Sequence, residues 1–113
     1  MGAGITLWGR NKHDESLQAI AFLRQHGFAA DRLLDLDRQP PTVDEIARIR
    51  TGLGGSLAPL AATGIEPPGL EWFHEGPARF KAPVLLTPKG ALVGFREQAW
   101  RRFFEVDKIH DAA

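Results

Sequence analysis

The first third of the chain constrains the fold most, because it is built as a strand, a helix and a second strand in close succession. Residues 4–8 form a short apolar run with β-branched and aromatic members, as expected of a buried strand. Residues 14–26 show the broad apolar face of an amphipathic helix, and Gly27 follows as a natural C-terminal stop. Residues 32–36 predict the second strand. Strands joined in this way are parallel with a right-handed crossover, which predicts an α/β sheet.

The last third predicts a hairpin and a closing helix. Residues 83–87 and 91–95 are apolar, and Pro88-Lys89-Gly90 between them has the composition of a tight turn, so the two strands should pair antiparallel. A final helix is predicted over residues 97–104. The side chains of that helix expected to face inward are Trp100, Phe103 and Phe104.

The middle of the chain predicts short helices without further strands. The stretch from Thr42 to Glu45 has the pattern of a capping box, so a helix should begin there and end at the glycines of residues 52–55. Ser56 is predicted to cap another short helix over residues 57–63, and one or two helical turns are expected around residues 70–74. The aromatic pair of that second stretch, Trp72 and Phe73, is expected to anchor the core.

Composition narrows the functional classes. The 113 residues contain no cysteine, so the chain alone forms no disulfide, no thiolate metal site and no redox-active thiol. The basic and acidic side chains balance at 14 each, which argues against direct binding to nucleic acid or to an anionic membrane. No repeat or linker divides the sequence, so residues 1–113 are interpreted as a single domain.

Targeting and metal signals are weak. The longest apolar stretches, such as residues 19–23, are much shorter than the ~20 residues of a membrane span, and no signal peptide is apparent, so a cytoplasmic protein is expected. Met1-Gly2 with Thr6 fits a myristoylation pattern, but Thr6 falls in the first predicted strand, and we do not expect the modification. No metal site is expected either, because no two of the histidines have helical ligand spacing; they are His13, His26, His74 and His110.

The order of elements and several short stretches resemble the thioredoxin fold, and more narrowly the arsenate reductases (ArsC) and the related Spx-type regulators. The resemblance covers residues 5–104 and is carried by Ile5-Thr6-Leu7-Trp8, Gln25-His26-Gly27, Pro40-Pro41-Thr42, Ala82-Pro83-Val84-Leu85-Leu86-Thr87-Pro88-Lys89-Gly90 and Val93-Gly94-Phe95. It implies a thioredoxin-like α/β domain: a central mixed β-sheet made from a βαβ unit and a ββα unit, helices on its faces, and a helical insertion between the units. It also implies that Pro83 follows a cis peptide bond and faces the active site.

The active-site residues of this family do not carry over. Where the resemblance places the nucleophilic cysteine, just before the first helix, the chain has His13, and Ser16 stands at the second cysteine position of Spx-type relatives. The three positions of the oxyanion-binding arginines align with Ala62, Ala82 and Phe95. In the family a thiolate must attack arsenate and then form a mixed disulfide, which imidazole cannot do. That mechanism is therefore excluded for this chain acting alone; whether it is an enzyme of another kind stays open, with a non-catalytic role favoured.

His13 has two interpretations. A neutral imidazole at the start of a helix could act as a base or donate a hydrogen bond to a bound group, whereas the plainer interpretation, which we prefer, is a solvent-exposed side chain without a role. Arg10, Lys12, Arg79 and Lys81 could form a basic rim for a carboxylate, a phosphate or glutathione, although a solvated surface of mixed charge is the simpler interpretation. No catalytic residue and no metal ligand is assigned. The candidate ligand-binding residues are Arg10, Asn11, Lys12, His13, Lys81 and Pro83.

Two functions follow from these observations. The first is a non-catalytic, arsenate-reductase-like binding or regulatory module; Spx-type relatives contact RNA polymerase, which suggests a protein partner by analogy. The second is a glutathione-dependent oxidoreductase, or a protein that binds glutathione or a small anion, in which the thiol comes from outside the chain. Glutathione is then the one expected cofactor, paired along the Pro83 edge with its sulfur near His13.

Overall fold

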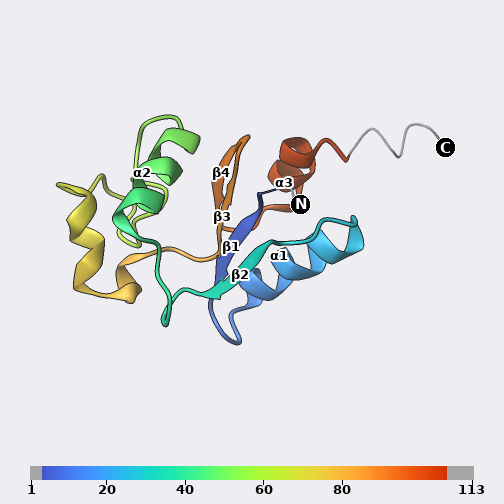
Figure 1. Ribbon diagram of the computed structural model, residues 1–113, viewed down its shortest axis with the longest axis horizontal. Coiled ribbons are helices and arrows are strands. Elements are labelled where there is room, and N and C mark those ends of the chain that lie inside the picture. Colours follow the sequence, from blue (N-terminus) through green and yellow to red (C-terminus); the bar gives the residue numbers. More distant parts are fainter. Residues whose placement is uncertain (1–3, 107–113) are drawn as a thin grey trace.

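The computed structural model describes residues 4–106, and within this range the chain forms a four-stranded sheet. The strands are β1 (Thr6–Gly9), β2 (Arg32–Asp35), β3 (Val84–Thr87) and β4 (Gly90–Val93), in the spatial order β2-β1-β3-β4. β2 is parallel to β1, and the other neighbouring strands are antiparallel. The mixed sheet predicted from the sequence, with a βαβ unit followed by a ββα unit, is therefore confirmed (Figure 1).

Helices cover both faces of this sheet (Figure 1). One face carries α1 (Asp14–Gln25) and α3 (Glu97–Phe104). The other carries α2 (Val43–Gly52) and two 3-10 helices, η1 (Leu70–Glu75) and η2 (Pro77–Arg79). The helical insertion implied by the resemblance therefore occupies one face, and the helices predicted over residues 14–26 and 97–104 occupy the other.

Strand side chains alternate between two separate cores. Leu7 and Leu85 pack toward α1 and α3, whereas Trp8 and Val84 pack toward α2 and η1. All four side chains are completely buried. A slip of either strand by one residue would exchange the two sets, so burial on both faces fixes the register of the sheet.

The aromatic residues expected in the core are found there. Phe73 is buried and Trp72 packs against the same core, on the α2 side of the sheet. Trp100 is buried on the other side, while Phe103 and Phe104 are only partly buried at the edge of that core. The inward face predicted for the last helix is confirmed, with Trp100 as its anchor.

The turn of the β3–β4 hairpin is one residue shorter than the sequence predicts. Thr87 pairs with Gly90, so the turn consists of Pro88 and Lys89 alone, and Gly90 is the first residue of β4. The Thr87 hydroxyl accepts a hydrogen bond from the Lys89 N–H at 3.1 Å and holds the turn. β4 also ends before residue 95, because Gly94 adopts a left-handed φ of 79° and leaves the strand.

The prediction of a short helix over residues 57–63 is wrong, because the backbone of this segment pairs with a distant one. Residues 60–62 run beside residues 79–81. Ala61 and Phe80 form an isolated antiparallel bridge, and backbone hydrogen bonds flank it on both sides. Backbone groups used in such pairing cannot also serve a helix.

Ser56 therefore begins a turn instead of a helix. Its hydroxyl accepts a hydrogen bond from the Ala58 N–H at 3.1 Å and donates one to the Glu66 carboxylate at 2.7 Å. That hydrogen bond from Ser56 is the main reason that the pKa of Glu66 lies below its usual value. Two side chains thus close the turn that the sequence assigns to a helix N-terminus.

α2 begins at the capping box that the sequence predicts. The Thr42 hydroxyl accepts from the Glu45 N–H at 3.2 Å, and the Glu45 carboxylate accepts from the Thr42 N–H at 2.9 Å. The same carboxylate accepts from the Arg32 guanidinium at 2.7 Å and so joins α2 to β2. Burial raises the pKa of Glu45, but the hydrogen bonds from Thr42 and Arg32 outweigh it, and the pKa lies below its usual value.

The C-terminal end of α2 lies directly on β4, because Gly52 has no side chain. A methyl group on Gly52 would lie 2.7 Å from the Ala91 backbone nitrogen and 2.9 Å from the Ala91 methyl carbon. Ile46 and Ile49 of the same helix are fully buried in the core beneath it. Close approach at one end and apolar burial along the helix together hold α2 on the sheet.

Candidate functional site

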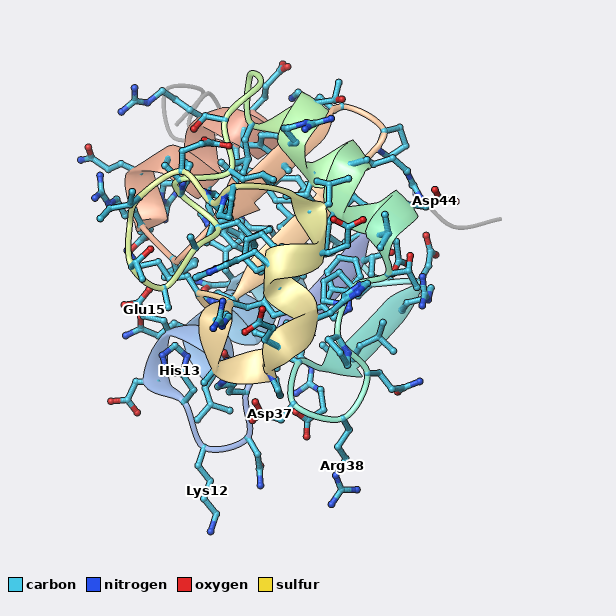
Figure 2. All side chains as sticks on the ribbon, turned by 90° about the vertical axis from the view of Figure 1, so that its left-hand side faces the viewer. Lys12, His13, Glu15, Asp37, Arg38 and Asp44 are labelled. Carbon is cyan, nitrogen blue, oxygen red and sulfur yellow. The ribbon has the colours of Figure 1, made fainter. Side chains whose placement is uncertain are left out.

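His13 is the N-cap of α1, and its ring holds the first turn of that helix. The Ser16 N–H donates to His13 Nδ1 at 3.3 Å, and the Ser16 hydroxyl lies 2.9 Å from the same nitrogen. The side chain is half-buried, and Figure 2 shows it at the same end of α1 as Glu15. The preferred interpretation of His13 as an exposed side chain without a role is therefore corrected, because the residue caps the helix.

Ser16, at the second of the family's cysteine positions, is enclosed by the chain. It is 1% exposed, and its hydroxyl accepts from the Arg10 N–H at 3.0 Å while facing His13 Nδ1. Gly9 allows this fit, since a methyl group on Gly9 would lie 3.1 Å from Ser16 Cβ. Both positions at which the resemblance expects thiols thus carry side chains that hold the backbone in place.

The Arg10 guanidinium is engaged by other segments of the chain. It donates to the Asp37 carboxylate at 3.2 Å, to the Phe80 carbonyl at 3.1 Å and to the Pro77 carbonyl. These contacts tie the loop before α1 to the loop after β2 and to the segment before Pro83. The donors of this candidate ligand-binding residue are therefore used within the fold.

Asn11 and Lys12 form the exposed turn that leads into α1. Lys12 has a left-handed φ of 63°, and Figure 2 shows its side chain directed away from the body of the protein. Together with Arg10, the two residues line a shallow hollow between α1 and β2. This hollow lies beside the open edge of the sheet and contains neither Lys81 nor Pro83.

Lys81 lines a different groove, of about 650 Å³, between the start of α1 and the loop after β4. The charged side chains of this groove are Glu15, Lys81 and Arg96. Pro83 is buried beside it: the Ala82–Pro83 bond is cis, as predicted, and the Pro83 carbonyl accepts from the Gly94 N–H at 2.8 Å. The structure thus does not gather the candidate ligand-binding residues in one site. Arg10, Asn11 and Lys12 line one hollow and Lys81 lines another, whereas His13 and Pro83 line neither.

Glu15 supplies a contact that the sequence does not reveal. Its carboxylate accepts from the Phe95 N–H at 2.9 Å, between residues 80 positions apart. Phe95 stands at one of the family's arginine positions, and its ring packs on Trp100 with centroids 5.1 Å apart. Of the other two arginine positions, Ala82 is buried and Ala62 is exposed, and neither offers a charge. A carboxylate therefore lies close to a position where the resemblance requires a cation.

The proposed basic rim does not form as a unit. The Arg79 guanidinium lies over the Trp72 ring, 4.5 Å from its centroid, and bonds to the Glu75 carboxylate at 2.9 Å. Arg79 and Arg10 are thus engaged in the fold, and Lys81 is left in the groove with Arg96. The sequence does not place Arg96 beside Lys81, although Arg96 directly follows an aligned arginine position.

Among residues 4–106, no group of three or more His, Cys, Asp or Glu side chains could hold a metal ion. No helix in this part of the chain is long and apolar enough to cross a lipid bilayer. Gly2 of the lipidation pattern and His110 lie outside the described residues.

The sheet order, the cis-proline and the helices on both faces together make a thioredoxin-like fold. No known family model matches the sequence, and no curated protein matches it significantly. Solved structures do match. A protein described as related to the ArsC family, from Bacteroides fragilis, aligns over 91% of this chain and 99% of its own, with a TM-score of 0.78 and 14% identity.

Two further structures extend this likeness. The arsenate reductase of Vibrio cholerae aligns over 94% of this chain and 99% of its own, with a TM-score of 0.70 and 15% identity. An arsenate reductase (ArsC) related protein from Brucella melitensis aligns over 93% and 96%, with a TM-score of 0.61 and 18% identity. The chain therefore has the arsenate reductase fold over nearly its whole length, and it contains no cysteine. At these identities the likeness establishes the fold, and activity must be argued from the site.

Proposed function

We propose that this protein is a non-catalytic binding or regulatory module built on the arsenate reductase fold. The observation that carries the proposal is the pair His13 and Ser16. At both positions that the resemblance assigns to thiols, the side chain holds the first turn of α1 in place. Without a thiol, the chain can neither attack arsenate nor carry a mixed disulfide.

The charges at the same end of α1 also oppose an oxyanion. A helix N-terminus normally offers free N–H groups and the positive end of the helix dipole to an anion. Here the Ser16 N–H donates to His13, and Asp14 and Glu15 place carboxylates in the first turn. The guanidinium of Arg10 bonds to other parts of the chain. An arsenate ion at this place would meet negative charge and few free donors.

An arsenate reduction assay tests the absence of catalysis. The protein is mixed with arsenate, glutathione and glutaredoxin, and arsenite is measured, with the Vibrio cholerae arsenate reductase as the positive control. We expect no more arsenite than in the mixture without the protein. Turnover above that rate, lost in a His13→Ala variant, would overturn the proposal.

One observation favours a second function, the binding of glutathione or another small anion. Lys81 and Arg96 line the same groove, where Glu15 is the carboxylate that faces them. Against it, residues 79–81, which come directly before the Ala82–Pro83 bond, already pair with residues 60–62, and this leaves less backbone for an extended tripeptide to pair with. Titration with glutathione and with arsenate, followed through the amide shifts of residues 10–16, 82–84 and 94–96, separates the two functions. The absence of amide shifts at millimolar ligand would refute the second function.

The first function requires a protein partner. By analogy with Spx-type regulators, we propose RNA polymerase as the first candidate, and contact with it would place the protein in the cytoplasm. Binding to purified RNA polymerase of the same organism can be measured on an immobilised protein. The absence of saturable binding would remove this partner, and the absence of any reproducible partner after cross-linking in cells would count against the module itself.

A further inference from the structure

The open edge of the sheet beside α1 carries an uncovered apolar surface. β2 is an end strand of the four-stranded sheet, and β1 is its neighbour. Leu17 and Leu33 are 54% and 52% exposed, and they line one hollow together with Ile20. This hollow continues along α1 into a second one of about 310 Å³, which shares Ile20 and Leu33 and is otherwise mostly apolar. Exposed apolar side chains that adjoin in this way are typical of an interaction surface.

The backbone of β2 offers hydrogen-bonding groups at the same edge. The N–H groups of Arg32 and Leu36 donate to carbonyls of the β1 segment. Because strand backbone groups alternate in direction, Leu33 and Asp35 turn their N–H groups away from β1, and Leu33 its carbonyl also. The Asp35 carbonyl already accepts from the turn that follows β2. An added strand can therefore pair with the N–H and carbonyl of Leu33 and with the N–H of Asp35.

The free charges around this surface are positive. Lys12 lines one end and Arg24 the other, both are exposed, and among residues 4–106 neither side chain has an ion pair. The other charged residues of the surface are already paired: Arg10 bonds to Asp37, and the Asp35 carboxylate accepts from the Asp37 N–H and lies 4.0 Å from the Arg38 guanidinium. The surface is therefore complementary to a partner that carries carboxylates at both ends of an apolar stretch.

We propose that the β2 edge is the docking site of an extended segment of another protein, apolar in its middle and acidic at its ends, which adds to the sheet beside β2. Alternate apolar side chains of the segment pack on Leu17, Ile20 and Leu33, while its carboxylates meet Lys12 and Arg24. The length fits: residues 12 to 24 span roughly 18 Å at ~1.5 Å per helical residue, which about six extended residues cover. Folded proteins normally protect their edge strands with charge or a covering segment, and here an exposed leucine stands at the edge.

This inference names the kind of partner for the proposed binding module and rests on that function. The probe is an acetylated and amidated peptide of alternating valine and threonine with two glutamates at each end, added to isotope-labelled protein. We expect saturable shifts of the Leu33 and Asp35 amides and of the Leu17 and Ile20 methyl groups. Leu33→Glu should weaken binding by about tenfold or more, because it places a charge in the apolar contact.

Matched variants distinguish peptide binding at the β2 edge from binding at other exposed apolar side chains. Ile65→Glu alters a side chain that is 70% exposed and lies outside both hollows, and should bind the peptide as the wild type does. If thermal melting shows that Leu33→Glu is unfolded, Leu17→Glu on the exposed face of α1 takes its place. A peptide of the same core with lysines at both ends should bind at least about tenfold more weakly than the glutamate peptide.

Several results would overturn the proposal. They are the absence of shifts at millimolar peptide, equal binding by Leu33→Glu and the wild type, and equal binding of the lysine-flanked peptide. Self-association of the protein that shifts the same amides without peptide would assign the edge to a second copy and exclude a foreign strand. The outcome is independent of the arsenate assay, since turnover would refute the non-catalytic function and leave the peptide result unchanged.

Discussion

Replacing His13 with alanine removes hydrogen-bonding partners at the start of α1. The Ser16 N–H loses its acceptor, and the enclosed Ser16 hydroxyl loses the ring nitrogen that lies 2.9 Å away. The loss of an N-cap acceptor costs about 1 kcal/mol. An enclosed hydroxyl without an acceptor for its proton adds roughly 1 kcal/mol. We therefore expect His13→Ala to lower the free energy of unfolding by about 1–2 kcal/mol, whereas loss of an exposed side chain without a role changes it by less than ~0.5 kcal/mol.

Urea unfolding followed by tryptophan fluorescence measures this difference, and thermal melting supports it at about 4–8 °C for each kcal/mol. His74→Ala is the matched control, because His74 is exposed on η1, and it should leave stability unchanged. His13→Asn should recover most of the loss, since an asparagine oxygen can accept from the Ser16 N–H.

Two outcomes would contradict the capping role of His13. A His13→Ala protein as stable as His74→Ala would refute it, and His13 would return to being a side chain without a structural role. Equal losses for His13→Ala and His13→Asn would show that ring packing, and not the hydrogen bond, stabilises the helix start.

Three further predictions concern the scaffold. Gly52→Ala should lower the free energy of unfolding by about 1–3 kcal/mol, because its methyl group would lie 2.7 Å from a backbone nitrogen of β4, while Gly76→Ala, with open space around it, should melt like the wild type. Glu45→Gln should be less stable than the wild type at neutral pH. The pKa of Glu45 is lowered in the fold, so its stabilisation is present above the unfolded value of ~4.3 and is lost as the pH falls through the lower folded value. The difference in unfolding free energy between Glu45→Gln and the wild type should therefore shrink as the pH falls below ~4.3. Lys12→Gly should raise stability by up to about 1 kcal/mol in calorimetry, because φ is 63° there, whereas Asn11→Gly should not. The first prediction would be contradicted if Gly52→Ala melted at the same temperature as Gly76→Ala. The second would be contradicted if the stability difference between Glu45→Gln and the wild type did not change with pH, and the third if Lys12→Gly were less stable than the wild type.

Elements defined by neighbouring residues were predictable from the sequence. The helix predicted over residues 14–26 forms as α1, and the capping box of α2 forms between Thr42 and Glu45, since both depend on contacts within a few positions. The cis bond before Pro83 is also confirmed, but it came from the resemblance and not from the chemistry of the chain. Periodicity and capping thus predict where elements begin and end, and they predict little about what the site contains.

Contacts between distant positions could not be predicted in the same way. Arg10 binds the Phe80 carbonyl, and Glu15 binds the Phe95 N–H, over separations of 70 and 80 residues. From its sequence neighbours alone, Arg10 is an ordinary residue of a polar loop, and Glu15 is an ordinary acidic residue in the first turn of a helix. The position of His13 was predicted correctly and its role was not, because the enclosed Ser16 hydroxyl that engages it becomes visible only in three dimensions.

The shared hydrogen bonds of His13 and Ser16 bear on how a thiol enzyme could be engineered from this scaffold. A cysteine at position 13 removes the cap, and a cysteine at position 16 places a larger atom in an enclosed space that already approaches Gly9 closely. Glu15, held by Phe95, would oppose the thiolate in either case. Each substitution taken alone therefore costs stability before any reactivity is gained. A laboratory conversion should therefore replace the cap, the carboxylate and the missing cations together, because each single substitution lowers the stability of the fold.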